Sequence, residues 1–329
     1  MKRRHTLPVT LVGIVFATAA SGTHAQTSDA AFPVRNMRFI VPFGSGSGPD
    51  ALGRRLAQGL AEKTGRNIIV DNRVGASGLI GIAELARAVP DGHTIAITNL
   101  ATPVAQVMMS KPPADLALDV TPVAQLFRQY TILVVRPNLP VKSAKDLVDM
   151  MKEKPGAYTF ASGGSGTPAH LAGEMFVRAV GAKAVHVPYK GIVPAAVSDI
   201  IRGDVLFACS VVSNVATLVQ GGRLKGLAIV GPKRLIAFPE VPSFTEAGIP
   251  DPDVSSWTGV VAPKDTPVAI RQKLNRLLRE IADDPAHAKA FVMLGTDPAQ
   301  ASVEQFGDYI KSELKRWAKF VKETNIRID

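Results

Sequence analysis

Hydrophobic and polar positions along this chain follow two patterns that take turns. Short continuous apolar runs, typical of buried strands, are followed by segments in which apolar residues recur every three or four positions, typical of helices. Strands are expected at about 38–41, 68–70, 94–97, 130–135, 158–161, 185–187, 205–208, 224–230 and 257–261. Helices are expected at about 51–64, 79–88, 143–155, from 169 onward, 193–202, 268–282, 285–294 and 302–324. This alternation predicts an α/β fold with mostly parallel sheets and helices on both faces.

Three of the expected strands run into a helix through a loop rich in glycine and serine. These loops are 43–50, 71–78 and 162–168. Glycine lets backbone N–H groups turn toward a ligand without obstruction by Cβ, and the first N–H groups of a helix carry partial positive charge. Such a corner can receive a carboxylate or phosphate. The alternative for the first loop, taken alone, is a tight turn that binds nothing.

The middle of the chain repeats the strand–loop–helix scheme of the first part, which predicts two α/β lobes. Lobe 1 would comprise residues 26–127 together with 230–329, and lobe 2 would comprise residues 128–229. The chain would cross between the lobes twice, and two crossings without bulky linkers make a hinge. Because ligands bind beyond the carboxyl ends of strands in open α/β sheets, the loops of both lobes should face one cleft.

Residues 1–25 have the pattern of a secretory signal peptide. Lys2, Arg3 and Arg4 precede an apolar segment that is too short to span a membrane, and small residues lead to Ala25. We expect cleavage after Ala25 and a mature protein outside the cytoplasmic membrane, most simply in a bacterial periplasm. A retained anchor helix is the alternative.

Charge and composition narrow the classes of partner. The chain has 38 Lys and Arg against 28 Asp and Glu, a net charge of +10, but neither a long basic block nor a basic stripe with aromatic residues. Nucleic-acid binding is therefore disfavoured, whereas an acidic small ligand or a negatively charged membrane surface fits. Cys209 is the single cysteine, so an intramolecular disulfide is impossible. The histidines after the leader lack metal-ligand spacing, and we expect neither a metal nor a cofactor.

Enzyme motifs are absent from the three loops. None contains GxSxG, GxGxxG or the Walker A lysine. Ser165 or Ser45 could pair with His170 in a secreted serine hydrolase, although a histidine so placed more often packs on the first helical turn. Asp50 stands at a helix start, where capping is the common role.

Hydrogen-bond donors without a nucleophile, metal or cofactor motif indicate a binding site. Arg73 beside the second loop would more often make a surface salt bridge, so neutral donors and ordered water should hold the anion. The candidate ligand-binding residues are Phe43, Gly44, Ser45, Gly46 and Ser47 in the first loop, Ser77 in the second, Ser162, Gly163, Ser165, Gly166, Thr167 and His170 in the third, and Asn99, Tyr189 and Ser210 near strand ends.

Several segments, in their order and spacing, carry a family resemblance. They read IVPFGSGSGPDALGR, VDNRVGASGLIG, PDGHTIAITN, FASGGSGTPAHLAGE, VPYKG, VPSFTEAGIP and KLN. The mature chain resembles the periplasmic substrate-binding proteins of tripartite tricarboxylate transporters, the Bordetella-uptake-gene type. This implies a type II periplasmic binding protein whose two domains close on a carboxylate and then dock on membrane subunits of a transporter. We expect a monomer. A ligand sensor without transport is the alternative.

Departures from the family pattern fall on the binding loops. Gly44 and Ser45 replace two prolines of the first loop, and Val74 replaces a proline of the second. Leu206 and Ser210 stand where the family often has acidic residues. These departures bear on the identity of the ligand of this chain more than on its fold.

Overall fold

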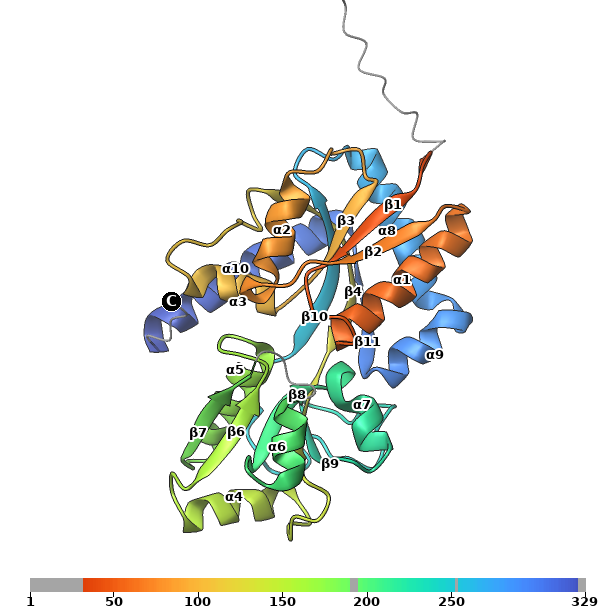
Figure 1. The fold of residues 1–329 in the computed structure, drawn as a ribbon. Coiled ribbons are helices and arrows are strands. Elements are labelled where there is room, and N and C mark those ends of the chain that lie inside the picture. Colours follow the sequence, from red (N-terminus) through yellow and green to blue (C-terminus); the bar gives the residue numbers. More distant parts are fainter. Residues whose placement is uncertain (1–31, 190–194, 252–253, 325–329) are drawn as a thin grey trace, which may run out of the picture.

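Two β-sheets, each flanked by helices, form the upper and lower lobes in Figure 1. The computed structural model describes residues 32–189, 195–251 and 254–324. The expected signal peptide and its cleavage site lie outside the described residues, as does the start of the helix expected at 193–202.

The upper sheet has six strands in the order β11-β4-β10-β3-β1-β2. β1 pairs in parallel with β2 and β3, whereas β10 is antiparallel to β3 and β4, and β11 is antiparallel to β4. The strands are β1 (Met37–Val41), β2 (Ile68–Asn72), β3 (Thr94–Asn99), β4 (Val120–Gln129), β10 (Ser256–Pro263) and β11 (Thr296–Ala301). The helices of this lobe are α1 (Gly48–Thr64), the short 3₁₀ helix η2 (Ala76–Gly78), α2 (Leu79–Ala86), α3 (Ala101–Met108), α8 (Val268–Asp283), α9 (Pro285–Met293) and α10 (Val303–Thr324).

The lower sheet has five strands in the order β7-β6-β8-β5-β9. β6 is parallel to β7 and β8, and β5 is antiparallel to β8 and β9. The strands are β5 (Thr131–Val135), β6 (Tyr158–Ser162), β7 (Ala184–Pro188), β8 (Phe207–Val211) and β9 (Lys225–Val230). The helices are α4 (Ala144–Glu153), α5 (Pro168–Ala179), α6 (Val197–Arg202) and α7 (Val212–Gln220).

The expected apolar faces form the cores of both lobes. In α1, Leu52, Leu56 and Leu60 are fully buried, as their spacing predicts. The apolar run 39–41 in β1 is fully buried as well. In the part of the chain that the structure describes, no helix is both long and apolar enough to cross a bilayer.

The sheets are mixed, whereas the sequence pattern predicts mostly parallel ones. The difference comes from β4, β10 and β11 in the upper sheet and from β5 and β9 in the lower sheet, which all make antiparallel pairs. Elements β4, β11, α3 and α7 are absent from the sequence-based expectation. β4 reads VTPVAQLFRQ, and its Pro122 lies at a register irregularity opposite Val261, as expected for proline in a sheet.

The chain passes from one sheet to the other after β4 and returns after β9. Tyr130 separates β4 from β5, and residues after Val230 lead back to β10. β4 extends to Gln129, two residues beyond the expected edge of lobe 1. We propose the division into lobe 1 (26–127 and 230–329) and lobe 2 (128–229), with a hinge at these two crossings.

Candidate functional site

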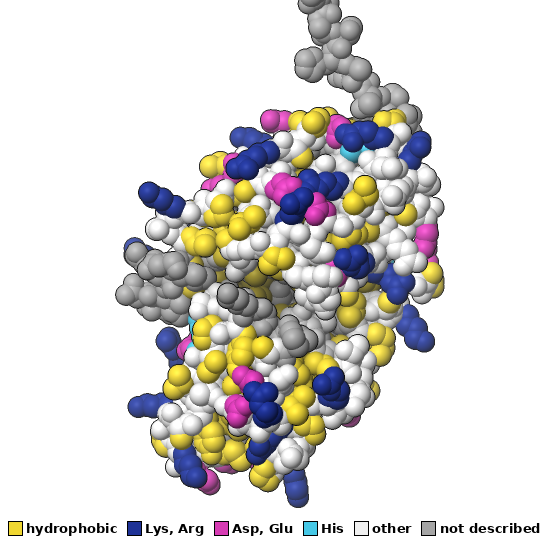
Figure 2. Space-filling model, viewed as in Figure 1, with side chains coloured by type: hydrophobic (Ala, Val, Ile, Leu, Met, Phe, Trp, Pro, Cys, Tyr) yellow, Lys and Arg dark blue, Asp and Glu magenta, His cyan; other side chains and the backbone are white. Residues whose placement is uncertain are grey.

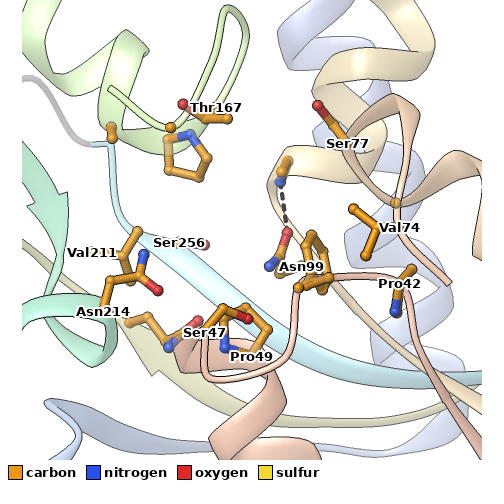
Figure 3. Close-up of a pocket in the computed structure, with 18 of the residues that line it drawn as sticks. Pro42, Ser47, Pro49, Val74, Ser77, Asn99, Thr167, Val211, Asn214 and Ser256 are labelled. Atoms are coloured by element: carbon orange, nitrogen blue, oxygen red, sulfur yellow. Dashed lines mark hydrogen bonds between the residues drawn. The ribbon is translucent and has the colours of Figure 1, made fainter. Parts of the chain in front are cut away.

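A cavity of about 720 Å³ lies where the loops of the two lobes meet. Figure 2 shows charged side chains spread over the outer parts of both lobes, and mainly apolar and uncharged atoms around the hollow between them. Figure 3 shows the cavity lining. The lining residues are Pro42, Phe43, Gly44, Ser45, Gly46, Ser47, Pro49, Val74, Gly75, Ala76, Ser77, Gly78, Asn99, Ala101, Gln129, Gly163, Thr167, Pro168, Ala169, Val211, Asn214 and Ser256.

Four α-helices present their N-termini to this cavity. Ser47 caps α1, and its hydroxyl accepts from the backbone N–H of Asp50. Thr167 caps α5, and its hydroxyl accepts from the backbone N–H of His170. α3 and α7 begin beside the cavity too, and each contributes lining residues. The peptide dipoles of these helices place partial positive charge beside the cavity, and no lining side chain among the described residues is cationic.

Among the described residues that line the cavity, none has a charged side chain. The polar lining consists of serine and threonine hydroxyls, asparagine and glutamine amides, and backbone groups of the glycine-rich loops. Proline, valine, alanine and phenylalanine side chains provide the apolar remainder. Such a cavity can bind a small anion by hydrogen bonds and helix dipoles, and it can cover the carbon skeleton with apolar contacts.

The first loop is held in shape by the buried carboxylate of Asp50. One carboxylate oxygen, Oδ2, accepts from Gly46 N and Arg54 Nε, both at 2.9 Å. The other oxygen, Oδ1, accepts at 2.9 Å from Asn72 Nδ2, which also donates to Phe43 O at 2.9 Å. Burial alone would raise the pKa of Asp50, but these hydrogen bonds and the Arg54 charge lower it below its usual range. Asp50 is therefore a positioning residue behind the loop.

The second loop has an unusual backbone. Ala76 and Ser77 have φ values of +46° and +51°, the left-handed region that residues with a Cβ rarely adopt. Gly75 and Gly78 on either side also have positive φ values. Strained residues of this kind cluster at ligand-binding loops because the surrounding structure must enforce them. Figure 3 shows the Ser77 side chain at the edge of the cavity.

The third loop rests on two stacked histidines. The ring centroids of His170 and His186 are 4.0 Å apart. His170 Nδ1 accepts from Gly166 N at 3.1 Å, so this nitrogen carries no proton, and His186 Nε2 lies 2.7 Å from Ser162 Oγ. Burial, and for His170 also the neighbouring His186, lowers the pKa of each histidine to about 4. Both rings are therefore neutral at pH 7 and support the loop from behind.

Acid will destabilise the protein through these histidines. Their folded-state pKa values lie below the ordinary 6.5, so the unfolded chain binds more protons between about pH 4 and 6.5. The free energy of unfolding should fall as the pH falls through this window, by up to about 1.4 kcal/mol per pH unit for each histidine. Urea denaturation at pH 7, 6 and 5 measures the slope. The His186→Gln variant should have a shallower slope, and a slope equal to that of the wild type would contradict this assignment.

Nine of the sequence-predicted residues line the cavity, and six do not. The nine are Phe43, Gly44, Ser45, Gly46, Ser47, Ser77, Asn99, Gly163 and Thr167. The other six are Ser162, Ser165, Gly166, His170, Tyr189 and Ser210. Most of these six serve the protein itself: Ser162, Gly166 and His170 make the contacts just described, and Ser210 is fully buried in β8. The Tyr189 hydroxyl donates to Asp199, and burial together with this bond raises its pKa to about 12.

Several lining residues escape the sequence reasoning. Gln129, Asn214 and Ser256 add polar groups, and Val211 adds an apolar one. Gln129 and Ser256 stand at ends of β4 and β10, where the sequence shows no glycine-rich loop. Asn214 lies in the first turn of α7, which follows β8 without an intervening loop. A polar residue within the first helical turn after a buried strand is the signal that could have identified it.

The hydrolase alternative requires Ser45 or Ser165 to pair with His170, but the serine–histidine contact in the described structure joins Ser162 and His186. His170 accepts from Gly166 N, and the described structure contains no hydrogen bond from Ser45 or Ser165 to its ring. The serine that does contact a histidine is Ser162, whose side chain is buried and also bonded to the backbone of Gly164. Its hydroxyl is thus occupied in holding the third loop.

In the described ranges, no group of three His, Cys, Asp or Glu could hold a metal ion.

Comparison with known proteins gives a consistent family. A family model described as "Tripartite tricarboxylate transporter family receptor" matches residues 52–326. The chain is 34% identical over 320 residues to the BugT protein of Bordetella pertussis, with 97% of each chain covered. The solved structure of the periplasmic binding protein BugD has a TM-score of 0.80 and 27% identity, with 90% of this chain and 99% of that chain covered. Rpa4515 of R. palustris, solved with adipate, has a TM-score of 0.83 and 29% identity, with 88% and 97% covered.

These relatives confirm the predicted two-domain α/β fold of periplasmic binding proteins. They also indicate a periplasmic location, in agreement with the leader-like start of the sequence. A receptor family argues against the hydrolase alternative, since its members bind solutes. With the family model matching most of the chain and BugT aligned along nearly all of it, the chain belongs to the tripartite tricarboxylate transporter family of receptors.

Proposed function

We propose that this protein is a periplasmic receptor that captures a small organic acid in the cavity between its lobes for a tripartite tricarboxylate-type transporter. The observation that carries the proposal is the convergence of four helix N-termini on a cavity of about 720 Å³ whose described lining has no charged side chain. The volume suits a small molecule.

An anion gains from this arrangement in two ways. Each helix N-terminus stabilises a nearby negative charge by up to about 2 kcal/mol in partly buried geometries. The loops 43–47 and 162–167 would add hydrogen bonds from backbone N–H groups and hydroxyls. A carboxylate is the anion that we favour, because the related Rpa4515 was solved with adipate.

Capture would involve closure of the two lobes. The chain crosses between the sheets after β4 and after β9, and such paired crossings act as hinges in binding proteins. In our proposal the mature chain begins after Ala25, works as a monomer, and in its closed form docks on membrane subunits of the transporter.

Ligand-induced thermal stabilisation tests this function. We expect the purified mature protein to be stabilised by at least one acid in a set of di- and tricarboxylates and aromatic acids, because a ligand that binds only the folded state raises Tm. Titration calorimetry then gives Kd. Inorganic sulfate serves as the control for non-selective anion binding. Stabilisation by a neutral sugar, with none by any carboxylate, would refute the proposal.

A further inference from the structure

Two asparagines at the cavity have their amide orientations fixed by backbone donors. Asn99 Oδ1 accepts from Ala101 N at 2.9 Å, and Asn214 Oδ1 accepts from Gly48 N at 2.9 Å. Each bond turns the carbonyl oxygen toward the protein, and the NH₂ group is what remains for the cavity. Figure 3 shows both amides directed toward the cavity, and Asn99 is only 7% exposed. Neither NH₂ group donates to a protein acceptor within the described residues.

Three further polar side chains at or behind the cavity, Gln129, Thr167 and Asp50, are already engaged in hydrogen bonds within the protein. The amide oxygen of Gln129 accepts from Thr258 Oγ1 at 2.8 Å, and its nitrogen donates to Ser213 Oγ at 3.0 Å. The hydroxyl of Thr167 donates to Gly164 O at 2.7 Å and accepts from the helix. Asp50, the carboxylate behind the first loop, already accepts from three groups of lobe 1 and does not line the cavity.

Building on the proposed function, we propose that this cavity selects acids that carry no amino group, and that Asn99 and Asn214 determine this selectivity. Their NH₂ groups donate to carboxylate or hydroxyl oxygens of the ligand. An ammonium group brings three donors and a positive charge into a space that offers donors and helix N-termini. In the cavity it would find serine hydroxyls and backbone carbonyl oxygens as acceptors but no carboxylate among the described lining residues, and a buried charge without a counter-charge is strongly disfavoured.

Pairs of acids that differ only in an α-amino group test the selectivity. Suitable pairs are succinate and aspartate, glutarate and glutamate, 4-methylpentanoate and leucine, and 3-phenylpropionate and phenylalanine. We expect at least one amino-free acid to bind and its amino counterpart to bind at least about 100-fold more weakly, because mismatched buried polar groups discriminate strongly. Equal or tighter binding of the amino acid in that pair overturns this inference alone. Binding of no acid in any pair, together with no stabilisation by any acid of the wider set, overturns the proposed function and, with it, this inference.

Asparagine-to-aspartate variants assign the selectivity to the two residues. Asn99→Asp and Asn214→Asp keep an oxygen for the backbone N–H group and replace the cavity-facing NH₂ with an anionic oxygen. Each should weaken binding of the amino-free acid and lower the preference over its amino counterpart at least about tenfold. Asn36→Asp is the matched control, since Asn36 Oδ1 accepts from Asn67 N on the exposed surface. Thermal unfolding without ligand verifies that each variant folds. An unchanged preference in the folded variants overturns the role of these asparagines.

Discussion

Replacing Gly48 by alanine will weaken ligand binding by about 5- to 150-fold, the equivalent of roughly 1–3 kcal/mol of overpacking. Gly48 begins α1 in the upper lobe and lies against the start of α7 in the lower lobe. A Cβ at this position would lie 2.2 Å from Ser213 Oγ, 2.7 Å from Ser213 Cβ and 2.9 Å from its backbone carbon. The hydroxyl can rotate, but the other two atoms move only with α7. The substitution therefore separates the lobes and displaces Asn214, which accepts from Gly48 N.

Gly44→Ala is the matched control for this variant. Gly44 lines the same cavity, but a Cβ there would have no heavy atom within 4 Å, and its φ is not positive. Calorimetric Kd values for both variants, measured with the same acid, make the comparison. Equal Kd values would contradict the steric argument. Adding Ser213→Gly to Gly48→Ala removes two of the three close atoms and should restore part of the affinity, although Gln129 then loses its acceptor.

The strand–loop–helix pattern in the sequence points to the loop of lobe 1 that lines the cavity. Loop 43–47 follows β1 and leads into α1, and all five of its residues line the cavity. This success has a physical cause: a buried strand, a glycine-rich turn and a capped helix each leave a local signal. Asn99 was found for the same reason, since it ends the apolar strand β3.

The parts that sequence reasoning missed depend on contacts between distant segments. β11 reads TDPAQA and has no apolar run, yet it pairs with β4 at the edge of the upper sheet. α7 reads VSNVATLVQ, is rich in β-branched residues and has no side-chain cap, so no helix start marks it. Without α7, Asn214 could not be placed opposite Gly48, which is 166 positions away in the sequence.

In the third loop, three residues that the sequence suggests as ligand donors make contacts within the protein. Gly166 N donates to His170 Nδ1, and Ser162 Oγ lies within hydrogen-bond distance of His186 Nε2. His186 lies on the neighbouring strand β7, and only the parallel pairing of β6 with β7 brings it next to Ser162. Sequence spacing cannot reveal that a hydroxyl already has a partner from another strand.

Removing the buried carboxylate of Asp50 will have the largest effect on stability. In Asp50→Ala, Gly46 N, Arg54 Nε and Asn72 Nδ2 each lose the acceptor that Asp50 provides, and Asp50 is only 2% exposed. Loss of one partner from a buried charged network costs about 3–5 kcal/mol, which we reduce to about 2–4 kcal/mol because Arg54 is half exposed. Asn at this position does not restore the network, since an amide has one acceptor oxygen and its NH₂ would face Asn72 Nδ2.

Urea denaturation at pH 7 measures this loss, with Asp149→Ala as the matched control. Asp149 and Lys145 also form an ion pair four residues apart on a helix, but both side chains are exposed, so that variant should leave the free energy of unfolding nearly unchanged. The lowered pKa of Asp50 means that its contribution is complete above the unfolded pKa near 4 and is lost only as the pH falls through the lower folded value. The deficit of Asp50→Ala should therefore be the same at pH 6 and pH 8. A deficit as small as that of Asp149→Ala would show that the first loop keeps its shape without this carboxylate.

The affinity for the acid should fall together with the stability, because the same bonds that Asp50 accepts from Gly46 and Asn72 hold the Phe43–Ser47 backbone against the cavity.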